Sequence, residues 1–538
     1  MPNSKRLLPL ALVLVLGTSA FLPAQDALAG IPPDMDAVLA WDHPMEGSKA
    51  LQQAPWYDAL LQLFALENPS APKDIGNFFA TLARYSDLLE QKIVVAARGQ
   101  GNHFRWLAIA RNTSKLGLEA AAAKLGDLLD LDLELGEVNR VPGGRVADAG
   151  PGVTVGRSKS HLVLGATSAI VRRALRRLSD PSTVVPDAYG SLTSAAKGVR
   201  LVLPDGLFLK EFKSNFNLGD TDEFLSPLLL GGITNALAST KSLFAELVVG
   251  PQPTLRVEID RPESHSPQKD WKLAFRRPPL LNIHLGRDLA TLWRQRDQWV
   301  PKGAEPALAE FTSTMNIFLG GYDFDDLMSE LKPGVAFVAS LPIAGKAKTR
   351  PELLLPSFAL MFRTRFDTDL RRRFEAAFQT FLAVTNANST EEAQQPILLR
   401  HEKTAVGTLC IARRLSDPVN GRKGSEYNFE PTLLQSGDRL IIATRPDLAV
   451  HLARLGIEST VHGDDLDVDG AALAEILRLN RERLEEQALV ERGAEEDEAR
   501  RFADRIIGLA RAFRGLRLRS FDHEHRRVLT LSLEPAKP

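Results

Sequence analysis

Near the C-terminal end, three aspartates have the types and spacing that begin a calcium-binding loop. The segment 465–470 reads Asp-Leu-Asp-Val-Asp-Gly, so Asp465, Asp467 and Asp469 alternate ahead of a glycine suited to a sharp turn. Calcium takes six to eight oxygen ligands, and these carboxylates would supply three. The twelfth position should be a bidentate glutamate, but it is Ile476. Calcium is therefore one hypothesis, and we favour a structural one in which an alternating strand ends in a turn capped by Asp469.

Few other residues have the pattern of a metal site or a nucleophile. His523 and His525 would share one face of a strand, but no third ligand accompanies them. They are more typical of an exposed hairpin tip, and His103 beside the turn 99–102 has the same interpretation. Cys410 is the only cysteine, which excludes an intramolecular disulfide. Its apolar neighbours favour a small buried residue over a nucleophile.

No known catalytic signature occurs in the chain. It lacks the Gly-x-Ser-x-Gly elbow of hydrolases, the His-Glu-x-x-His of zinc proteases and the glycine-rich loops that hold nucleotides. Arginine clusters at 172–177 and 371–373 fall within expected helices, where a solvated face is a better interpretation than a phosphate site. The motifs alone therefore identify no reaction.

Two aligned stretches indicate how the elements that carry these residues are arranged. Residues 163–178 and 440–455 match without a gap, and each runs from an apolar strand through Ala-Thr or Ala-Thr-Arg into a helix ending in Leu-x-x-Leu. Other strands and helices flank both stretches in the same order. They include an Asp-Gly turn at 205–206 and another at 469–470, each between a strand and a helix. The sequence therefore predicts a tandem duplication of one module.

Each copy is predicted to be an α+β module with a mainly antiparallel sheet covered by helices. The closing segments 255–259 and 529–533 alternate apolar and polar residues, which indicates strands with one buried and one solvated face. The strands within a copy are too close in sequence for parallel crossovers. We place the first copy at 30–262, a polar linker at 263–279 and the second copy at 280–538.

Residues 1–29 have the pattern of a secretory signal peptide. A Lys-Arg pair precedes the apolar run 7–16, and Ala27-Leu28-Ala29 forms a small-x-small site with cleavage expected after Ala29. Farther along, no apolar run approaches the roughly 18 residues of a membrane-spanning helix. We therefore expect an exported protein, periplasmic or extracellular, without a transmembrane anchor. Lys and Arg total 66 against 67 Asp and Glu, so no strong field favours nucleic acid.

This layout resembles that of exported bacterial proteins with two α/β copies that are known only as domains of unknown function. The resemblance is carried by the leader, the two copies and the repeated strand–helix stretches 162–178 and 440–455. It implies a place in the cell envelope and no catalytic residue.

The leading hypothesis is a non-catalytic envelope protein that binds an unknown ligand or partner, or serves structurally, through the surface between the copies. It needs no cofactor. One alternative is an envelope hydrolase with a dispersed active site, and another is a calcium-stabilised surface protein built on Asp465, Asp467 and Asp469. A deep cleft with converging His, Asp or Ser side chains would favour the hydrolase. A shallow or apolar surface would favour a binding protein or scaffold.

Overall fold

The computed structural model describes residues 25–54, 57–58, 61, 70–84, 92–99, 104–111, 117–129, 134–150, 152–193, 198–214, 237, 239–248, 252–260, 270–298, 300, 302–320, 322–341, 353–365, 368–391, 396–414, 429–460, 463–523 and 526–536. The predicted α+β class is confirmed, because helices flank one large sheet whose strand pairs are antiparallel. Within these ranges, no helix combines the length and the apolar character that a membrane span requires.

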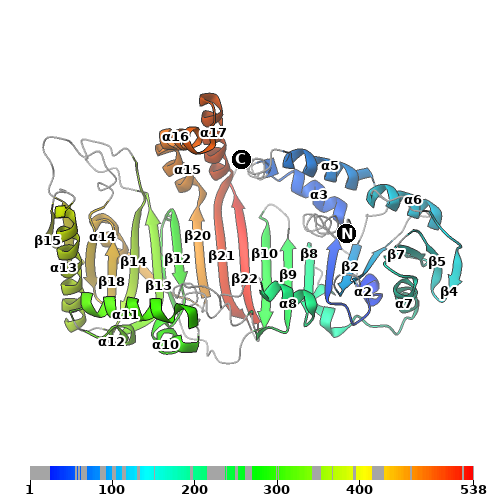
Figure 1. Ribbon diagram of the computed structural model, residues 1–538, viewed down its shortest axis with the longest axis horizontal. Helices are drawn as coiled ribbons and strands as arrows, with labels where there is room; N and C mark the ends of the chain where they lie inside the picture. The colour runs from blue at the N-terminus through cyan, green and yellow to red at the C-terminus, as the bar shows by residue number, and fades with distance from the viewer. Residues whose placement is uncertain are drawn as a thin grey trace.

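The 20-stranded sheet extends along the whole molecule, as Figure 1 shows. In the first half, the strands from the outer edge to the middle are β4 (Asn139–Val141), β5 (Gly144–Asp148), β6 (Thr154–Arg157), β7 (His161–Gly165), β3 (Arg105–Arg111), β2 (Lys92–Arg98), β1 (Ala37–Asp42), β8 (Val199–Pro204), β9 (Ser242–Val248) and β10 (Thr254–Asp260). In the second half, from the middle outward, they are β22 (Arg526–Pro535), β21 (Phe513–His523), β20 (Gly463–Asp469), β12 (Leu281–Leu285), β13 (Leu331–Ser340), β14 (Ser357–Thr364), β18 (Arg439–Ala443), β17 (Thr432–Ser436), β16 (Gly407–Arg414) and β15 (Ile397–Thr404).

The halves meet where β10 pairs with β22, from Thr254 opposite Ser532 to Asp260 opposite Arg526. If the ten strands of each half are numbered in chain order, both halves read 10-9-8-1-2-3-7-6-5-4 from this join outward. A small separate sheet pairs β11 (Asp270–Ala274) with β19 (Gly456–Thr460).

The two faces of the sheet are covered differently. We call the face that carries Leu255 face A and the face that carries Arg256 face B. The helices that pack on face A are α3 (Pro44–Gln52), α5 (Ala71–Arg84), α6 (Leu118–Leu129), α8 (Leu207–Ser214), α10 (Leu289–Arg294), α11 (Glu305–Phe318), α12 (Phe324–Ser329), α13 (Thr368–Glu391) and α15 (Gly470–Leu479). Those on face B are α2 (Gln25–Ala29), α7 (Ser168–Ser179) and α14 (Pro446–Arg454). The helices α16 (Arg481–Arg492) and α17 (Glu496–Ala512) lie beyond one end of the central strands (Figure 1).

The two stretches that align in sequence form matching structures on face B. Residues 163–178 run from β7 into α7, and residues 440–455 run from β18 into α14. The Thr167 hydroxyl caps α7 by accepting a hydrogen bond from the Ile170 backbone N–H at 3.4 Å. In α14 a proline follows directly after Arg445, where its fixed backbone angle suits a helix start. Apolar residues of both helices are buried against the sheet.

Regular structure includes part of the predicted linker and the predicted cleavage site. The described part of the linker at 263–279 contains β11, and its Trp271 is buried and donates a hydrogen bond to the Pro333 carbonyl at 2.8 Å. At the N-terminus, the expected cleavage site lies in α2. Leu28 is fully buried, and the Ala29 carbonyl accepts a hydrogen bond from Arg177 Nε at 2.8 Å. Residues 1–24, the remainder of the predicted signal peptide, lie outside the described residues, as do 261–269 of the linker region.

Candidate functional site

The three aspartates considered for calcium lie on strand β20, not in a loop. Asp465 and Asp467 project from face B opposite two arginines of β21. Arg517 Nε lies 2.6 Å from Asp467 Oδ1, and Arg519 Nε lies 3.3 Å from Asp465 Oδ1. Asp469 caps α15, because its carboxylate accepts a hydrogen bond from a backbone N–H of the first helical turn at 2.7 Å. The predicted cap is confirmed, and a calcium ion would compete with both arginines for these oxygens.

Face B carries polar and charged side chains through the middle of the sheet, most of them arginines and acids. The residues that lie opposite one another on successive strands are Arg200, Glu246, Arg256, Thr530, Arg519, Asp465 and His284. Opposite charges on neighbouring strands stabilise a sheet when they face each other. Burial raises the pKa of the Glu246 carboxyl, which lies between the two arginines that precede and follow it in this row. Each arginine of this row is held in an ion pair: Arg200 with Asp42, Arg256 with Glu258 and Arg519 with Asp465.

On face A the same strands carry a row of apolar side chains. From β9 to β12, the residues that lie opposite one another are Leu247, Leu255, Leu531, Leu518, Leu466 and Ile283. Over β10, β22, β21 and β20 this face also carries Val257, which packs with the cluster under α8, and Leu533, which packs with the cluster under α3, α5 and α6. We call the apolar side chains between these clusters the junction strip. Its members are Leu255, Leu529, Leu531, Leu516, Leu518, Leu466 and Val468.

The junction strip is only partly covered. Leu255 and Leu531 each keep 36% of their surface exposed, and the other members are half-buried. The seven residues stand outside the hydrophobic clusters that the described residues form. Figure 1 shows α8 near one end of β8 to β10 and α15 to α17 near the other end of β20 and β21, with no labelled helix across the middle of β21 and β22. The sequence predicted a face covered by helices, and among the described residues that cover is incomplete at the join, where it reaches Val257 and Leu533 but not Leu255 or Leu531.

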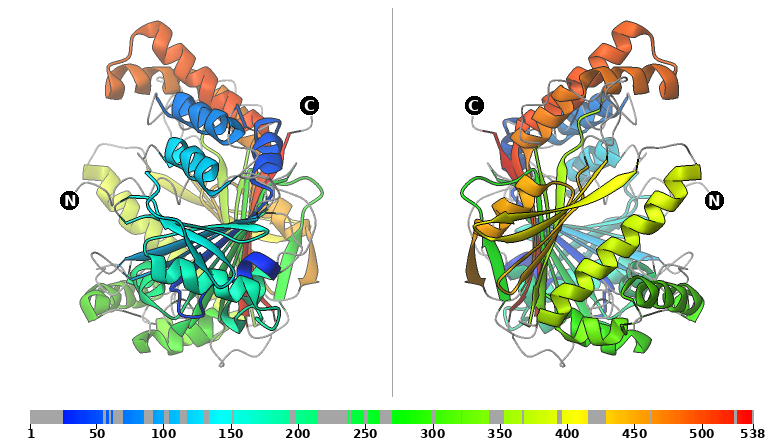
Figure 2. Two further views of the ribbon diagram at one scale, coloured as in Figure 1. Left: turned by 90° about the vertical axis from the view of Figure 1, so that its right-hand side faces the viewer. Right: turned by 90° about the vertical axis from the view of Figure 1, so that its left-hand side faces the viewer.

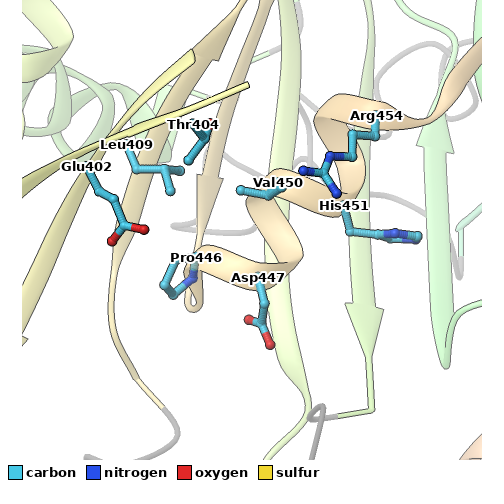
Figure 3. A pocket seen from close by; sticks show the side chains of 8 residues that line it. All are labelled: Glu402, Thr404, Leu409, Pro446, Asp447, Val450, His451 and Arg454. Carbon is cyan, nitrogen blue, oxygen red and sulfur yellow. The ribbon is translucent and has the colours of Figure 1, made fainter. Parts of the chain in front are cut away.

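A separate cavity of about 380 Å³ lies on face B near the outer edge of the second half, between α14 and the strands β15 and β16. Its polar side chains include Glu402, Asp447, His451 and Arg454. Figure 3 shows the His451 imidazole pointing away from the Glu402 and Asp447 carboxylates. Asp447 already pairs with Arg445, whose Nε lies 3.2 Å away. The cavity therefore does not bring an acid and a base together on one point.

The remaining predicted residues lie apart from both places. His523 is exposed and ends β21 at the hairpin to β22, as predicted, whereas His103 and His525 lie outside the described residues. Cys410 is buried on β16, which confirms its predicted burial. Two arginines of α7 make structural contacts: Arg173 lies 3.1 Å from Asp34, and Arg177 donates a hydrogen bond to the Ala29 carbonyl.

Comparisons with known proteins leave the family open. No family model matches the chain, and no curated protein matches it. A solved structure titled "Structure of crystal form III of TP0453" is similar to 46% of this chain and 82% of its own chain, with 10% identity and a TM-score of 0.26. A TM-score this low supports no statement about fold or function.

Proposed function

We propose that this chain is an exported, non-catalytic binding protein that holds an apolar, chain-like ligand against the junction strip. The observation that carries the proposal is a registered row of apolar side chains that stays partly exposed where the halves meet, to 36% at Leu255 and Leu531. Soluble proteins rarely leave such a continuous apolar patch open unless it binds something. The exported address rests on the leader sequence.

The proposal also includes a tandem duplication, in which β10 and β22 are equivalent strands. The identical order of ten strands on each side of the join supports it, together with the aligned stretches that form β7 with α7 and β18 with α14. Leu255 and Leu531, which lie opposite each other, would then be near-equivalent residues at a pseudo-twofold axis. A ligand on this axis would contact both copies through the same kind of side chain.

The size of the strip favours a slender ligand over a second protein. Neighbouring strands are about 4.8 Å apart and alternate residues about 7 Å apart, so four strands with at most two side chains each span roughly 14 by 7 Å. That area of roughly 100 Å² is about an eighth of the ~800 Å² that each partner contributes to a stable protein interface. A long acyl chain of a fatty acid or a lipid fits such a strip and continues along the row toward Leu247 and Ile283.

The hydrolase alternative gains no specific support. The described cavity with converging polar residues would be its best location, and there His451 points away from the two carboxylates. The calcium alternative remains a prediction with its own test, described below.

The proposal is tested by titrating the purified protein with a fluorescent long-chain fatty acid, and separately with a phospholipid. The key variant is Leu531→Gln, which keeps the size of the side chain and removes its apolar character. Its matched control is Thr530→Gln, at the preceding residue of β22, whose side chain projects from face B. Full burial of a leucine contributes about 1.5–3 kcal/mol, so covering its exposed third contributes about 0.5–1 kcal/mol, roughly a two- to five-fold change in Kd.

We expect Leu531→Gln to weaken fatty-acid binding while Thr530→Gln binds as the wild type does. Tighter binding of the phospholipid than of the free fatty acid would identify a lipid as the ligand class, and the reverse would identify the free acid. Absence of binding by the wild-type protein, or equal loss in both variants, would remove the junction strip from consideration.

A further inference from the structure

Three side chains with metal-ligand chemistry meet on face A at the outer end of the second half. Glu375 comes from α13, His401 from the edge strand β15 and Cys410 from β16. One ligand atom of each lies within 4.8 Å of those of the other two. Cys410 Sγ lies 3.4 Å from Glu375 Oε1. This site is at the far edge of the sheet from the junction strip, so it is independent of the proposed ligand site.

Two paired strands and one helix fix the backbone positions of the three residues. His401 lies directly opposite Cys410 in the β15–β16 pair, so both project from the same face. The helix α13 crosses these strands, as Figure 2 shows, and its Phe374 and Phe378 pack against the cluster that contains Cys410. That packing places Glu375, one residue after Phe374, over the sulfur. The third residue, His401, is exposed at the edge and has room to turn its ring.

The chemistry of the three groups selects a zinc-like ion. Cysteine sulfur, histidine nitrogen and a carboxylate oxygen are the ligands that Zn²⁺ uses, whereas Ca²⁺ and Mg²⁺ prefer oxygen alone. With Zn–S of about 2.3 Å and Zn–O of about 2.0 Å, a tetrahedral site separates sulfur from oxygen by roughly 3.5 Å. The observed 3.4 Å between Cys410 Sγ and Glu375 Oε1 already has this spacing. Only the His401 ring needs to move inward.

We infer that Glu375, His401 and Cys410 bind one Zn²⁺ ion, with a water molecule in the fourth position on the exposed side of β15. On binding, the Cys410 thiol releases its proton to solvent and coordinates as a thiolate, so the affinity rises with pH. Burial of the sulfur and exposure of the imidazole mean that the ion sits at the rim of the core, with a path to solvent past His401.

Cobalt(II) provides the test, because it replaces zinc in such sites and a thiolate ligand gives it a charge-transfer band in the near ultraviolet. The purified protein is titrated with Co²⁺ alone and then with Zn²⁺ in competition. The variants are Cys410→Ser, His401→Ala and Glu375→Gln. The matched control is Glu402→Gln, which alters the residue next to His401 on the opposite face of β15 and lines the separate cavity.

We expect one Co²⁺ per chain, a thiolate band that Zn²⁺ abolishes, and no thiolate band in Cys410→Ser. Loss of a distant supporting contact at a metal site commonly costs 10–100-fold in affinity, so loss of a direct ligand in His401→Ala or Glu375→Gln should cost about 100-fold or more. Glu402→Gln should bind as the wild type does. Since His401 is exposed, His401→Ala remains informative even where Cys410→Ser fails to fold. A cobalt spectrum without the thiolate band, or wild-type affinity in His401→Ala, would overturn the assignment.

Discussion

Replacing Lys92 by methionine should remove a rise in stability that the wild-type protein shows between pH 7 and pH 9.5. Lys92 lies on β2 and keeps only 7% of its surface exposed. Its Nζ lies 3.3 Å from Asp42 Oδ1, and Arg200 pairs with the same carboxylate. Burial lowers the pKa of the Lys92 ammonium to about 8, since the attraction of Asp42 is weaker than the cost of burial and the repulsion of Arg200 adds to that cost.

The sign and size of the effect follow from the two pKa values. The side chain titrates near 10.5 in the unfolded chain and near 8 in the folded one. Between these values the unfolded chain binds more protons than the folded chain, so the free energy of unfolding rises with pH. The rise approaches 1.4 kcal/mol per pH unit and totals about 2 kcal/mol from pH 7 to pH 9.5. Below pH 7 both states are protonated and the lysine contributes no slope.

Urea unfolding at half-unit steps of pH measures this slope. The quantity to compare is the free energy of unfolding of the wild type minus that of Lys92→Met at each pH, because other titrating groups cancel in the difference. Lys159→Met, which removes an exposed lysine before β7, is the control and should keep the wild-type slope. A difference that stays flat within about 0.5 kcal/mol over this range would refute the reasoning and show that Lys92 keeps an ordinary pKa in the folded protein.

Three further changes test the aspartates of β20, the close packing at Gly470 and the burial of Leu28. Changing the three aspartates of β20 to asparagine should abolish any rise in unfolding temperature caused by calcium, and a rise that persists in this variant would rule out those residues as the calcium site. Gly470→Ala would push a methyl group into the backbone carbonyl oxygen of Phe513 at the start of β21, and should lower the free energy of unfolding in urea by about 1–3 kcal/mol. Its control, Gly508→Ala on α17, should leave the free energy of unfolding unchanged or raise it by up to about 1 kcal/mol. A chain beginning at Gln25 should be more stable than one beginning at Gly30 by about 2 kcal/mol, because only the longer chain buries Leu28. Equal unfolding temperatures of the two chains would contradict this. The intact mass of the exported protein shows which form is made.

Local patterns in the sequence predicted the class of the fold and most of its strands. The alternation at 255–259 and 529–533 correctly indicated β10 and β22, and the short spacings between strands correctly indicated antiparallel pairing. The pairing of these two strands with each other could not be predicted, because it joins residues more than 260 positions apart and no local sequence pattern indicates it. The strand β11 was missed because Trp271 and its apolar neighbour Leu273 lie between prolines and charges that resemble a linker.

The candidate sites depended still more on contacts between distant residues. The aspartates of β20 have the spacing of a calcium loop, and only the folded sheet shows that Arg517 and Arg519 face them. The pair His401 and Cys410 did have a signal in the sequence. A tight turn at 405–406, between a strand that begins Ile-Leu-Leu and the apolar stretch 408–412, sets a register in which residues 401 and 410 lie opposite. Glu375 could not be added, because the crossing of α13 over this hairpin is a tertiary feature.

The join between the halves explains why a binding surface arises without a motif. In either half alone, β10 or β22 would be an edge strand with unpaired backbone groups, a liability that pairing removes. On face A, α8 packs against β9 and β10, and α15 packs against β12, β13 and β14. The cluster under α3, α5 and α6 also reaches Leu533 of β22. Pairing therefore satisfies the backbone of the join, while the apolar side chains between these clusters stay partly exposed. Leu255 comes from one half and Leu531 from the other, so the proposed ligand site exists only in the joined sheet and neither half encodes it alone.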